Sequence, residues 1–358
     1  MNSSPSLASL LANLYGIQKP TIDSDFEDLL TRKINIAPGI RSKASDSQNH
    51  LRDFLSEERN RDTSFPGVLS RVDRDFLGGS FARHTKKWPL DDIDVYVPLD
   101  GHGLFYYQNG VQLPYVVQSD GGLLWNPVLG NRWANGQYVS SMKVVWEFAC
   151  VLGRHYQESD VRANGNCVSV RMKHGKSDNN DGLGYDVVPC FSLKPTTTSE
   201  FEFYLIPDGS DGWIRTNPRL DTDLCEILQA YHNKVYRKVV KLIKFWNESR
   251  LNGKFSSYYI EYAICREFWR RKMKEERVST ITEGLAAGFE GIGRAFQAGD
   301  QTGWIEGAPA IQKPALTLYQ ISVLSLAGTN SGLAWINERL GKAADARKQW
   351  ASIFGDVF

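Results

Sequence analysis

The order of apolar and polar residues predicts a chain whose strands come early and whose helices dominate late. The clearest alternation is at Ile93, Val95 and Val97, whose side chains fall on one face of an extended segment and indicate a half-buried strand. Further alternating runs predict strands over 183–188 and 201–206 and a hairpin over 161–172 that turns at Asn164-Gly165. From Trp213 onward the apolar spacing is helical, so we place a lobe boundary near residue 210.

Helices are predicted where apolar residues recur every three or four positions. The predicted helical segments cover 21–55 (interrupted at Pro38-Gly39), 40–61, 140–156 and 224–250. The longest apolar run, 315–327, contains polar residues and fits a buried helix better than a membrane span. The segment 101–138 is rich in glycine, asparagine and aromatic residues, and it predicts a hairpin around Asn109-Gly110 without a functional assignment.

Strands followed by helices predict an α+β fold with a sheet-containing lobe and a C-terminal helical lobe. We expect three parts, which are an N-terminal helical part over 1–60, the sheet-containing lobe over 61–210 and the helical lobe over 211–358. The chain has 358 residues, of which 42% are hydrophobic, and this is enough to form a sizeable hydrophobic core.

Composition narrows the class of protein and its partners. The 42 basic and 41 acidic residues leave a net charge of +1, so we expect no strong nucleic-acid surface beyond a local patch. Five scattered cysteines without a C-x-x-C pair favour reduced thiols in a cytoplasmic protein over a disulfide framework or a zinc site. Residues 1–18 lack the basic region and cleavage site of a signal peptide. The sequence contains no run of about 18 apolar residues, so it predicts no membrane-spanning helix.

Candidate chemistry concentrates where a glycine-serine turn precedes the strand at 93–97. Asp92 and Asp94 point to the same face of that strand, with backbones about 7 Å apart from two strand rises. Two carboxylates so close raise each other's pKa unless a cation lies between them, and a divalent cation with oxygen ligands fits best. Gly79-Ser80 lets the backbone approach an anion closely. A phosphate cradle beside a metal-binding strand indicates a nucleoside triphosphate with Mg²⁺.

Together these motifs resemble the nucleotidyltransferase superfamily, whose signature is Gly-Ser, a spacer and an Asp-x-Asp pair flanked by apolar residues. That signature includes a third carboxylate on a neighbouring strand, and Asp186 supplies it. The runs that look like the bacterial cGAS/DncV-like branch, the CD-NTases, are Ser80–Thr85, Asp92–Asp94 and Tyr185–Pro189. The resemblance implies a bilobal fold with a DNA polymerase beta-like palm sheet. In that fold the lobe over 61–210 is the nucleotidyltransferase catalytic lobe, and the helical part over 1–60 braces both lobes.

The resemblance also implies roles for the site residues. Asp92, Asp94 and Asp186 would hold two Mg²⁺ ions, with Mn²⁺ as an alternative, for attack of a ribose hydroxyl on an α-phosphorus and loss of pyrophosphate. Asp186 would also serve as general base. Gly79 and Ser80 would hold the β- and γ-phosphates. The simpler alternatives are ordinary strand-end aspartates and a plain tight turn.

A second candidate group lies in the predicted helix over 224–250. Its lysines form a basic stripe at Lys234, Lys238, Lys241 and Lys244. By the resemblance Lys244 binds the triphosphate, and the alternative is that the stripe is a solvated face. Ser257 and Tyr258 resemble a serine that holds phosphate and a tyrosine that stacks on a base, a contact of about 1–3 kcal/mol. The alternative for Tyr258 is a core aromatic.

The activity that the resemblance implies is a synthase that joins and cyclises nucleoside triphosphates such as ATP or GTP into a second messenger. It also implies a separate effector protein that responds to the messenger, allows a regulatory partner, and indicates bacterial antiphage (CBASS) signalling. Two alternatives stay open. One is a template-independent enzyme that makes linear oligonucleotides or extends RNA, and the other is a non-catalytic nucleotide-binding module. The sequence does not predict the bases, the linkages or the ring size.

Overall fold

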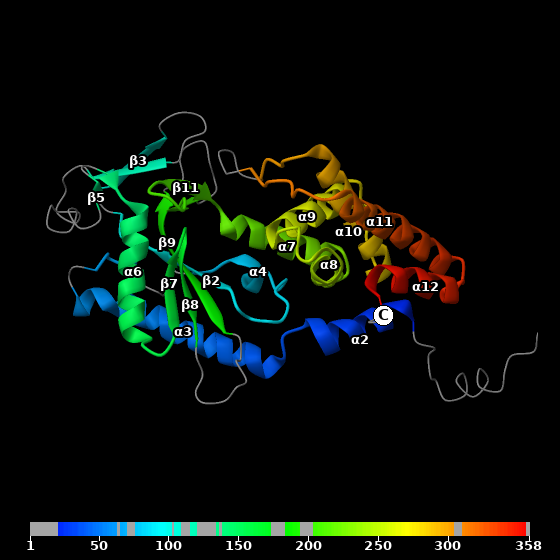
Figure 1. The fold of residues 1–358 in the computed structure, drawn as a ribbon, viewed down its shortest axis with the longest axis horizontal. Coiled ribbons are helices and arrows are strands. Elements are labelled where there is room, and N and C mark those ends of the chain that lie inside the picture. Colours follow the sequence, from blue (N-terminus) through cyan, green and yellow to red (C-terminus); the bar gives the residue numbers. More distant parts are fainter. Residues whose placement is uncertain are drawn as a thin grey trace, which may run out of the picture. The chain divides into compact units, whose positions relative to one another are not determined.

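The three-dimensional structure is a computed structural model. It describes residues 21–62, 65–69, 76–101, 104–108, 115–119, 134–135, 138–172, 183–193, 203–303 and 310–355. The chain divides into two compact units (Figure 1). The sheet unit comprises residues 35–228 and 298–313, and the helical unit comprises 1–34, 229–297 and 314–358. The predicted three-part division at residues 60 and 210 stays a prediction, and the predicted turn at Asn109-Gly110 lies outside the described residues.

The sheet unit is built on one mixed sheet. Its spatial strand order is β1-β2-β9-β10-β11-β4-β6-β5, with β3 beside β4 and β8 between β7 and β9. Among the described residues, β2 and β9 form the parallel pair and the other pairs are antiparallel. The strands are β1 (Phe76–Leu77), β2 (Ile93–Pro98), β3 (Leu104–Gln108), β4 (Tyr115–Ser119), β5 (Ala134–Asn135), β6 (Tyr138–Val139), β7 (Asp160–Asn164), β8 (Cys167–Arg171), β9 (Gly184–Leu193), β10 (Phe203–Pro207) and β11 (Trp213–Thr216).

The alternation that predicted the first strand is visible as burial along β2. Ile93, Val95 and Val97 are buried, whereas Asp94 and Tyr96 are only partly buried. The hairpin of β7 and β8 is also where the sequence predicts it, because Asn164 pairs with Cys167 around the turn. The strand pattern of the sequence therefore reproduces the part of the sheet that carries the candidate aspartates.

Two long helices contribute to the core of the sheet unit. α6 (Ser141–His155) lies against β7 to β10 (Figure 1). It begins where the hydroxyl of Ser140 accepts a hydrogen bond from the Lys143 amide. Its buried face joins one apolar cluster with Leu51 and Leu55 of α3 (Pro38–Arg61) and the central strands. Each fully buried aliphatic or aromatic side chain in such a cluster stabilises the fold by about 1.5–3 kcal/mol.

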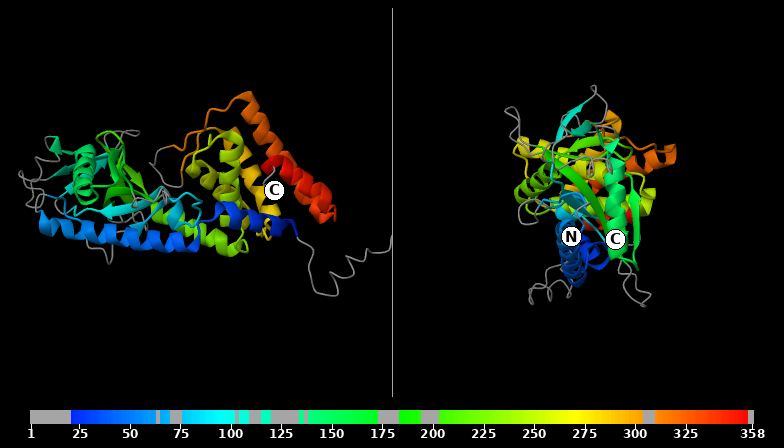
Figure 2. Two further views of the ribbon diagram at one scale, coloured as in Figure 1. Left: turned by 60° about the horizontal axis from the view of Figure 1, so that its bottom comes forward. Right: turned by 90° about the vertical axis from the view of Figure 1, so that its left-hand side faces the viewer.

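The helical unit gathers helices from both ends of the chain (Figure 2). Its elements are α2 (Ile22–Leu29), a π-helical turn (Leu30–Ile34), α8 (Tyr236–Leu251), α9 (Ser257–Met273), α10 (Ile281–Ala298), α11 (Leu318–Arg339) and α12 (Ala343–Phe354). Phe26 of α2 packs edge-on against Trp350 and Phe354, with ring centroids 5.2 and 5.4 Å apart. The Asp23 carboxylate accepts hydrogen bonds from the first amides of α10, at 2.9 and 3.1 Å. These contacts join the two ends of the described chain within one unit.

Two helix predictions need correction. The predicted helix over 224–250 is two helices, α7 (Pro218–Tyr231) and α8, because Asn233 and Lys234 adopt positive φ angles of 51° and 61° between them. The lysine stripe is therefore broken at Lys234. The apolar run at 315–327 begins a longer helix, α11, but this helix is not buried, because several of its large apolar side chains face solvent.

In the portion of the chain that the structure describes, every helix falls short of the length and apolarity that crossing a bilayer requires.

Candidate active site

Two of the three candidate aspartates lie side by side on neighbouring strands. β2 and β9 are parallel, and their register places Asp94 opposite Asp186. Adjacent strands lie about 4.8 Å apart, so the two side chains leave the sheet next to each other. Both residues are partly buried. The structure therefore brings together two carboxylates that are separated by more than ninety residues of sequence.

The glycine-serine turn lies directly against Asp94. β1 pairs with β2, and the chain leaves β1 at Gly78, whose amide donates to the Asp94 carbonyl at 3.0 Å. Gly79 follows with a φ of +59°, a conformation that side chains disfavour. A Cβ atom on Gly79 would stand 1.6 Å from Oδ2 of Asp94. The turn accordingly needs glycine at this position for two separate reasons, its backbone angle and the approach of the carboxylate.

Further hydrogen bonds fix the shape of the turn. The carbonyl of Ser80 accepts from the amides of Thr85 and Lys86, both at 2.9 Å. The Thr85 hydroxyl is fully buried and donates to the same carbonyl at 3.4 Å. The turn continues into the four-residue helix α4 (Gly79–Ala82). Arg83 ends this helix and is 8% exposed, so its guanidinium is largely withdrawn from solvent.

Asp186 is held in place by its other neighbouring strand. In the register of β8 with β9, Ser169 lies opposite Asp186, and its hydroxyl donates to Oδ1 at 2.7 Å. Arg171 of the same strand reaches the same oxygen at 3.4 Å. Both contacts orient the carboxylate through one oxygen. Sequence reasoning identified neither Ser169 nor Arg171, because only the strand register shows that they face Asp186.

The buried thiol of Cys167 reports the negative charge of this region. Burial, the nearby carboxylate of Asp186 and, to a smaller extent, Asp94 raise the pKa of Cys167 to about 12. Two carboxylates thus act on one thiol from adjacent strands. An accumulation of negative charge at a partly buried position favours a bound cation.

The third aspartate is paired with a lysine that sequence reasoning missed. Lys86 donates from its ammonium to Asp91 Oδ1 at 2.7 Å and also to Asp92 Oδ1. Its side chain is only 12% exposed. Asp92 precedes β2, so its carboxylate lies at the start of the strand that carries Asp94. Asp91 is exposed and shares the lysine with Asp92.

A metal-ligand set is not fully assembled in the described residues. Within them, no three acidic, histidine or cysteine side chains are grouped closely enough to hold a metal ion as they stand. Asp94 and Asp186 are adjacent, whereas Asp92 is engaged by Lys86. The donors are carboxylate oxygens, which are the ligands that Mg²⁺ and Mn²⁺ prefer. The chemistry of these residues fits such an ion, provided that Asp92 exchanges its lysine for the metal.

The candidate phosphate ligand of the helical unit is buried. Lys244 of α8 is 4% exposed, and its ammonium donates to Oε1 of Glu261 on α9 at 2.5 Å. Glu261 is equally buried. A buried ion pair of this kind fixes two helices relative to each other, and breaking it would leave one uncompensated charge. Lys244 therefore does not present its ammonium to solvent in this structure.

Ser257 and Tyr258 lie in the first turn of α9 and are both exposed. Tyr258 is 40% exposed, so the alternative that it is a core aromatic is wrong. The preceding loop is fixed by Asn247, whose side chain exchanges two hydrogen bonds with the backbone of Phe255 at 2.9 and 3.1 Å. Ser256 caps the helix by accepting from the Tyr259 amide. The exposed first turn of a 17-residue helix can receive an anion.

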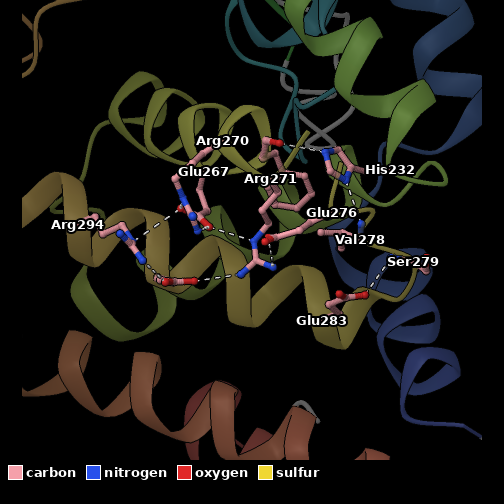
Figure 3. Close-up of polar contacts among 11 residues, drawn as sticks. His232, Glu267, Arg270, Arg271, Glu276, Val278, Ser279, Glu283 and Arg294 are labelled. Carbon is pink, nitrogen blue, oxygen red and sulfur yellow. Dashed lines mark hydrogen bonds and ion pairs between the residues drawn. The ribbon is translucent and has the colours of Figure 1, made fainter. Parts of the chain in front are cut away.

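A network of charged side chains joins α9 and α10 (Figure 3). Glu267 is buried and accepts from Arg270 at 2.5 and 2.9 Å and from Arg271 at 3.0 Å. Arg271 also donates to Glu290 of α10 at 3.1 Å. The carboxylates compensate these arginines, so the network stabilises the helix pair and is a weak candidate for an anion site.

The same view contains a fully buried histidine (Figure 3). The amide of Val278 donates to Nδ1 of His232 at 3.1 Å, so Nε2 carries the proton and donates to the Phe268 carbonyl at 3.1 Å. Burial lowers the pKa of His232, and the neighbouring Arg271 and Arg277 lower it further. The imidazole is consequently held neutral by its surroundings and serves as a structural link.

Comparison with known proteins places this geometry in context. No protein-family model matches the chain. A protein of Bacillus cereus (strain VD146), described as a probable cyclic nucleotide synthase, is 25% identical over 357 residues, which cover 94% of this chain and 98% of that protein. Escherichia coli MS115-1 CdnC, solved with ATP, superposes with a TM-score of 0.60 at 16% identity, over 95% of this chain and 99% of that one. Vibrio cholerae DncV, in its apo form, gives a TM-score of 0.59 at 13% identity, over 94% and 95% of the two chains.

The chain has the cGAS/DncV-like nucleotidyltransferase fold. The resemblance read from three short motifs is thereby confirmed, as is the predicted α+β architecture with a C-terminal helical part. The agreement with the cGAS/DncV-like fold extends over nearly the whole chain, not only over the strands that carry Asp94 and Asp186. A second CdnC structure, a complex with a HORMA-deltaN protein, gives a TM-score of 0.59 at 17% identity over 94% of this chain and 98% of that one.

Proposed function

We propose that the protein is a nucleotidyltransferase that joins nucleoside triphosphates and cyclises the product, with release of pyrophosphate. The observation that carries this proposal is the pairing of Asp94 with Asp186 on adjacent parallel strands, with the Gly79 turn packed against the Asp94 carboxylate. Acidic strands beside a glycine turn provide sites for a cation and for a polyphosphate within one small region. The B. cereus relative, described as a probable cyclic nucleotide synthase, supports the same activity.

The three aspartates are the residues that would hold Mg²⁺ or Mn²⁺. A pair of such ions supplies charge neutralisation at the entering and leaving oxygens of a phosphoryl transfer. In this chain Asp94 and Asp186 are already adjacent, and Asp92 joins them when its carboxylate leaves Lys86. Lys86 would then be free to face the triphosphate.

Asp186 is the candidate general base. Ser169 and Arg171 both hold its Oδ1 atom and so fix the orientation of the carboxyl group. A base fixed in this way can accept the proton of a ribose hydroxyl without first paying the entropy of ordering its own side chain. Ser169 and Arg171 are accordingly positioning residues for the reaction.

Each unit, considered by itself, contains candidate contacts for the phosphates or the base. In the sheet unit, Gly79 and Ser80 would contact the β- and γ-phosphates through the backbone and the Ser80 hydroxyl. In the helical unit, Ser257 would contribute phosphate contacts, and the exposed ring of Tyr258 would stack on a base. Lys244 would act through the α8–α9 contact instead, since its ammonium is engaged by Glu261.

The product would be a second messenger that activates a separate effector protein, in bacterial antiphage (CBASS) signalling. Substrate choice among ATP, GTP and other triphosphates depends on pocket side chains that the motifs do not fix. The solved complex of CdnC with a HORMA-deltaN protein suggests a regulatory partner for this chain as well. The CdnC structure with ATP supports a nucleotide substrate.

The experiment that tests this function follows labelled triphosphates, singly and in mixtures, with Mg²⁺ or Mn²⁺. Phosphatase-resistant label is the expected result, because a cyclic product has no terminal phosphate. A phosphatase-sensitive ladder would indicate linear extension, and nucleotide binding without product would indicate a binding module. Asp186→Asn should abolish product. Asp28→Asn is the control, since Asp28 of α2 is an exposed aspartate whose carboxylate pairs with Arg32 four residues later.

A further inference from the structure

Helix α11 carries an apolar stripe on the side opposite its packed face. Its buried residues are Leu324, Ala327, Ser331 and Ala334, which face the rest of the helical unit. The exposed apolar side chains are Leu318, Tyr319, Leu326, Leu333, Ile336 and Leu340, the last lying just beyond the helix. At 100° per residue these two sets fall on opposite sides of the helix. α12 packs beside α11, and both helices lie at one edge of the helical unit (Figure 2).

The spacing of this stripe is that of a helix–helix seam. Tyr319, Leu326, Leu333 and Leu340 are separated by seven residues each, and they are between 45% and 72% exposed. A strict seven-residue repeat favours left-handed packing against another helix. No charged residue occurs from Leu318 to Asn337. A solvent-facing stripe on a lone helix normally carries charges, so this one is built to be covered.

The exposed area is sufficient for a dimer. With roughly 200 Å² for a fully exposed large side chain, the stripe offers roughly 700 Å². A stable protein–protein interface buries about 800 Å² from each partner. The stripe with its immediate polar neighbours reaches this size in a pairing of two identical copies.

We propose that α11 is a homodimer interface, in which the stripe of one chain packs antiparallel against the same stripe of a second copy. A two-fold axis near Thr329 brings Leu326 of one chain against Leu333 of the other, and Tyr319 against Leu340. Such an interface is self-complementary, as two-fold symmetry requires. The inference does not depend on the chemistry of the aspartates.

Two other occupants are less well matched to the stripe. The first 20 residues of the chain contain Leu7, Leu10, Leu11 and Leu14, but a helix over 7–17 would be about 16 Å long. The α11 stripe extends about 33 Å, so this segment would cover half of it. A lipid surface is also disfavoured, because helices that lie on membranes carry lysine and arginine beside the apolar face. A second α11 matches both the length and the absence of charge.

The test is the mass of the full-length protein by light scattering and sedimentation velocity between about 1 and 100 μM. We expect twice the monomer mass for the wild type, and the monomer mass for Leu326→Glu and Leu333→Glu. Ile321→Glu is the matched control, because Ile321 is an exposed apolar residue of the same helix outside the stripe, and it should remain dimeric. Unchanged circular dichroism and melting temperature would show that the variants are folded.

A cross-linking experiment places the axis. Thr329→Cys should form a disulfide-linked dimer under mild oxidation, whereas the wild type should not. A wild-type protein that is monomeric throughout the range would overturn the proposal, and so would a dimer that persists in both glutamate variants. If deletion of residues 1–20 converts a monomer into a dimer, the chain's own first segment covers the stripe and the proposal is also wrong.

Discussion

Substituting Gly79 by alanine tests how closely the turn and the acidic strand depend on each other. Two costs are expected. The φ of +59° disfavours any residue with a Cβ, by about 1–2 kcal/mol. The new Cβ would also stand 1.6 Å from Oδ2 of Asp94, far inside the ~3.5 Å at which non-bonded heavy atoms come to rest. The carboxylate therefore has to move by about 2 Å, and an off-rotamer side chain adds about 1 kcal/mol.

A matched control separates these two costs. Gly165, in the turn of the β7–β8 hairpin, has the same φ of +59°, but a Cβ there would meet nothing closer than the Cα of Gly209 at 3.8 Å. Gly165→Ala should therefore lower the free energy of unfolding only by the backbone cost, about 1–2 kcal/mol. Gly79→Ala should lower the free energy of unfolding by about 2–3 kcal/mol, the sum of the two costs.

The difference in activity should be much larger than the difference in stability. A misplacement of about 1 Å in a reacting constellation can cost about 100-fold in rate. We expect Gly79→Ala to reduce pyrophosphate release at least about 100-fold and Gly165→Ala to reduce it less than about threefold. Urea unfolding followed by circular dichroism gives the stability, and a coupled pyrophosphate assay gives the rate. Equal activity in the two variants would refute the argument that Asp94 and the turn form one site.

Three further predictions concern residues away from the turn. His232→Gln should remove an acid-sensitive part of the free energy of unfolding. Because the pKa of His232 is lowered in the folded protein, the wild type has this stabilisation in full above pH ~6.5 and loses it as the pH falls through the folded-state pKa. Urea unfolding at a series of pH values measures the loss. Lys244→Met should destabilise the fold by about 3–5 kcal/mol, and adding Glu261→Met should restore most of that loss, which a double-mutant cycle measures. Lys86→Met should increase Mn²⁺ affinity several-fold in the nucleotide-free protein, measured by paramagnetic resonance of free Mn²⁺, because it removes the ammonium that competes for Asp92; unchanged affinity would contradict this reading.

Local patterns predicted the elements that carry the candidate site. Alternation gave the strand at 93–97, and Asn164-Gly165 gave the hairpin, because both depend on neighbouring residues alone. The motif around Gly79 was equally local. The structure adds the physical reason for that glycine, which is that the Asp94 carboxylate occupies the space a Cβ on residue 79 would need.

Contacts between distant segments were not predictable in the same way. The partners of Asp186 depend on the register of β8 against β9, and no single-strand pattern encodes that register. The pairing of Lys86 with Asp92 depends on how the chain returns after α4. Lysine spacing suggested a phosphate ligand at Lys244, yet a glutamate on the next helix neutralises it inside the unit.

The predicted helix boundaries were wrong where backbone angles, and not side-chain periodicity, decide where a helix ends. The break between α7 and α8 lies at two consecutive residues with positive φ, Asn233 and Lys234. Asparagine tolerates that conformation, but a lysine gives no such signal. The apolar content of α11 predicted burial, and only the three-dimensional arrangement shows that half of this helix faces solvent.

The central claim is that this chain makes a cyclic oligonucleotide with Asp94 and Asp186 at its reactive centre. Mass spectrometry of the product formed from a mixture of the four nucleoside triphosphates and Mg²⁺ tests it most directly. The account predicts a mass equal to a whole number of nucleoside monophosphate units joined into a ring, present with the wild type and absent with Asp94→Asn. A product that retains a 5′-triphosphate, or a ring that still forms in Asp94→Asn, would contradict it.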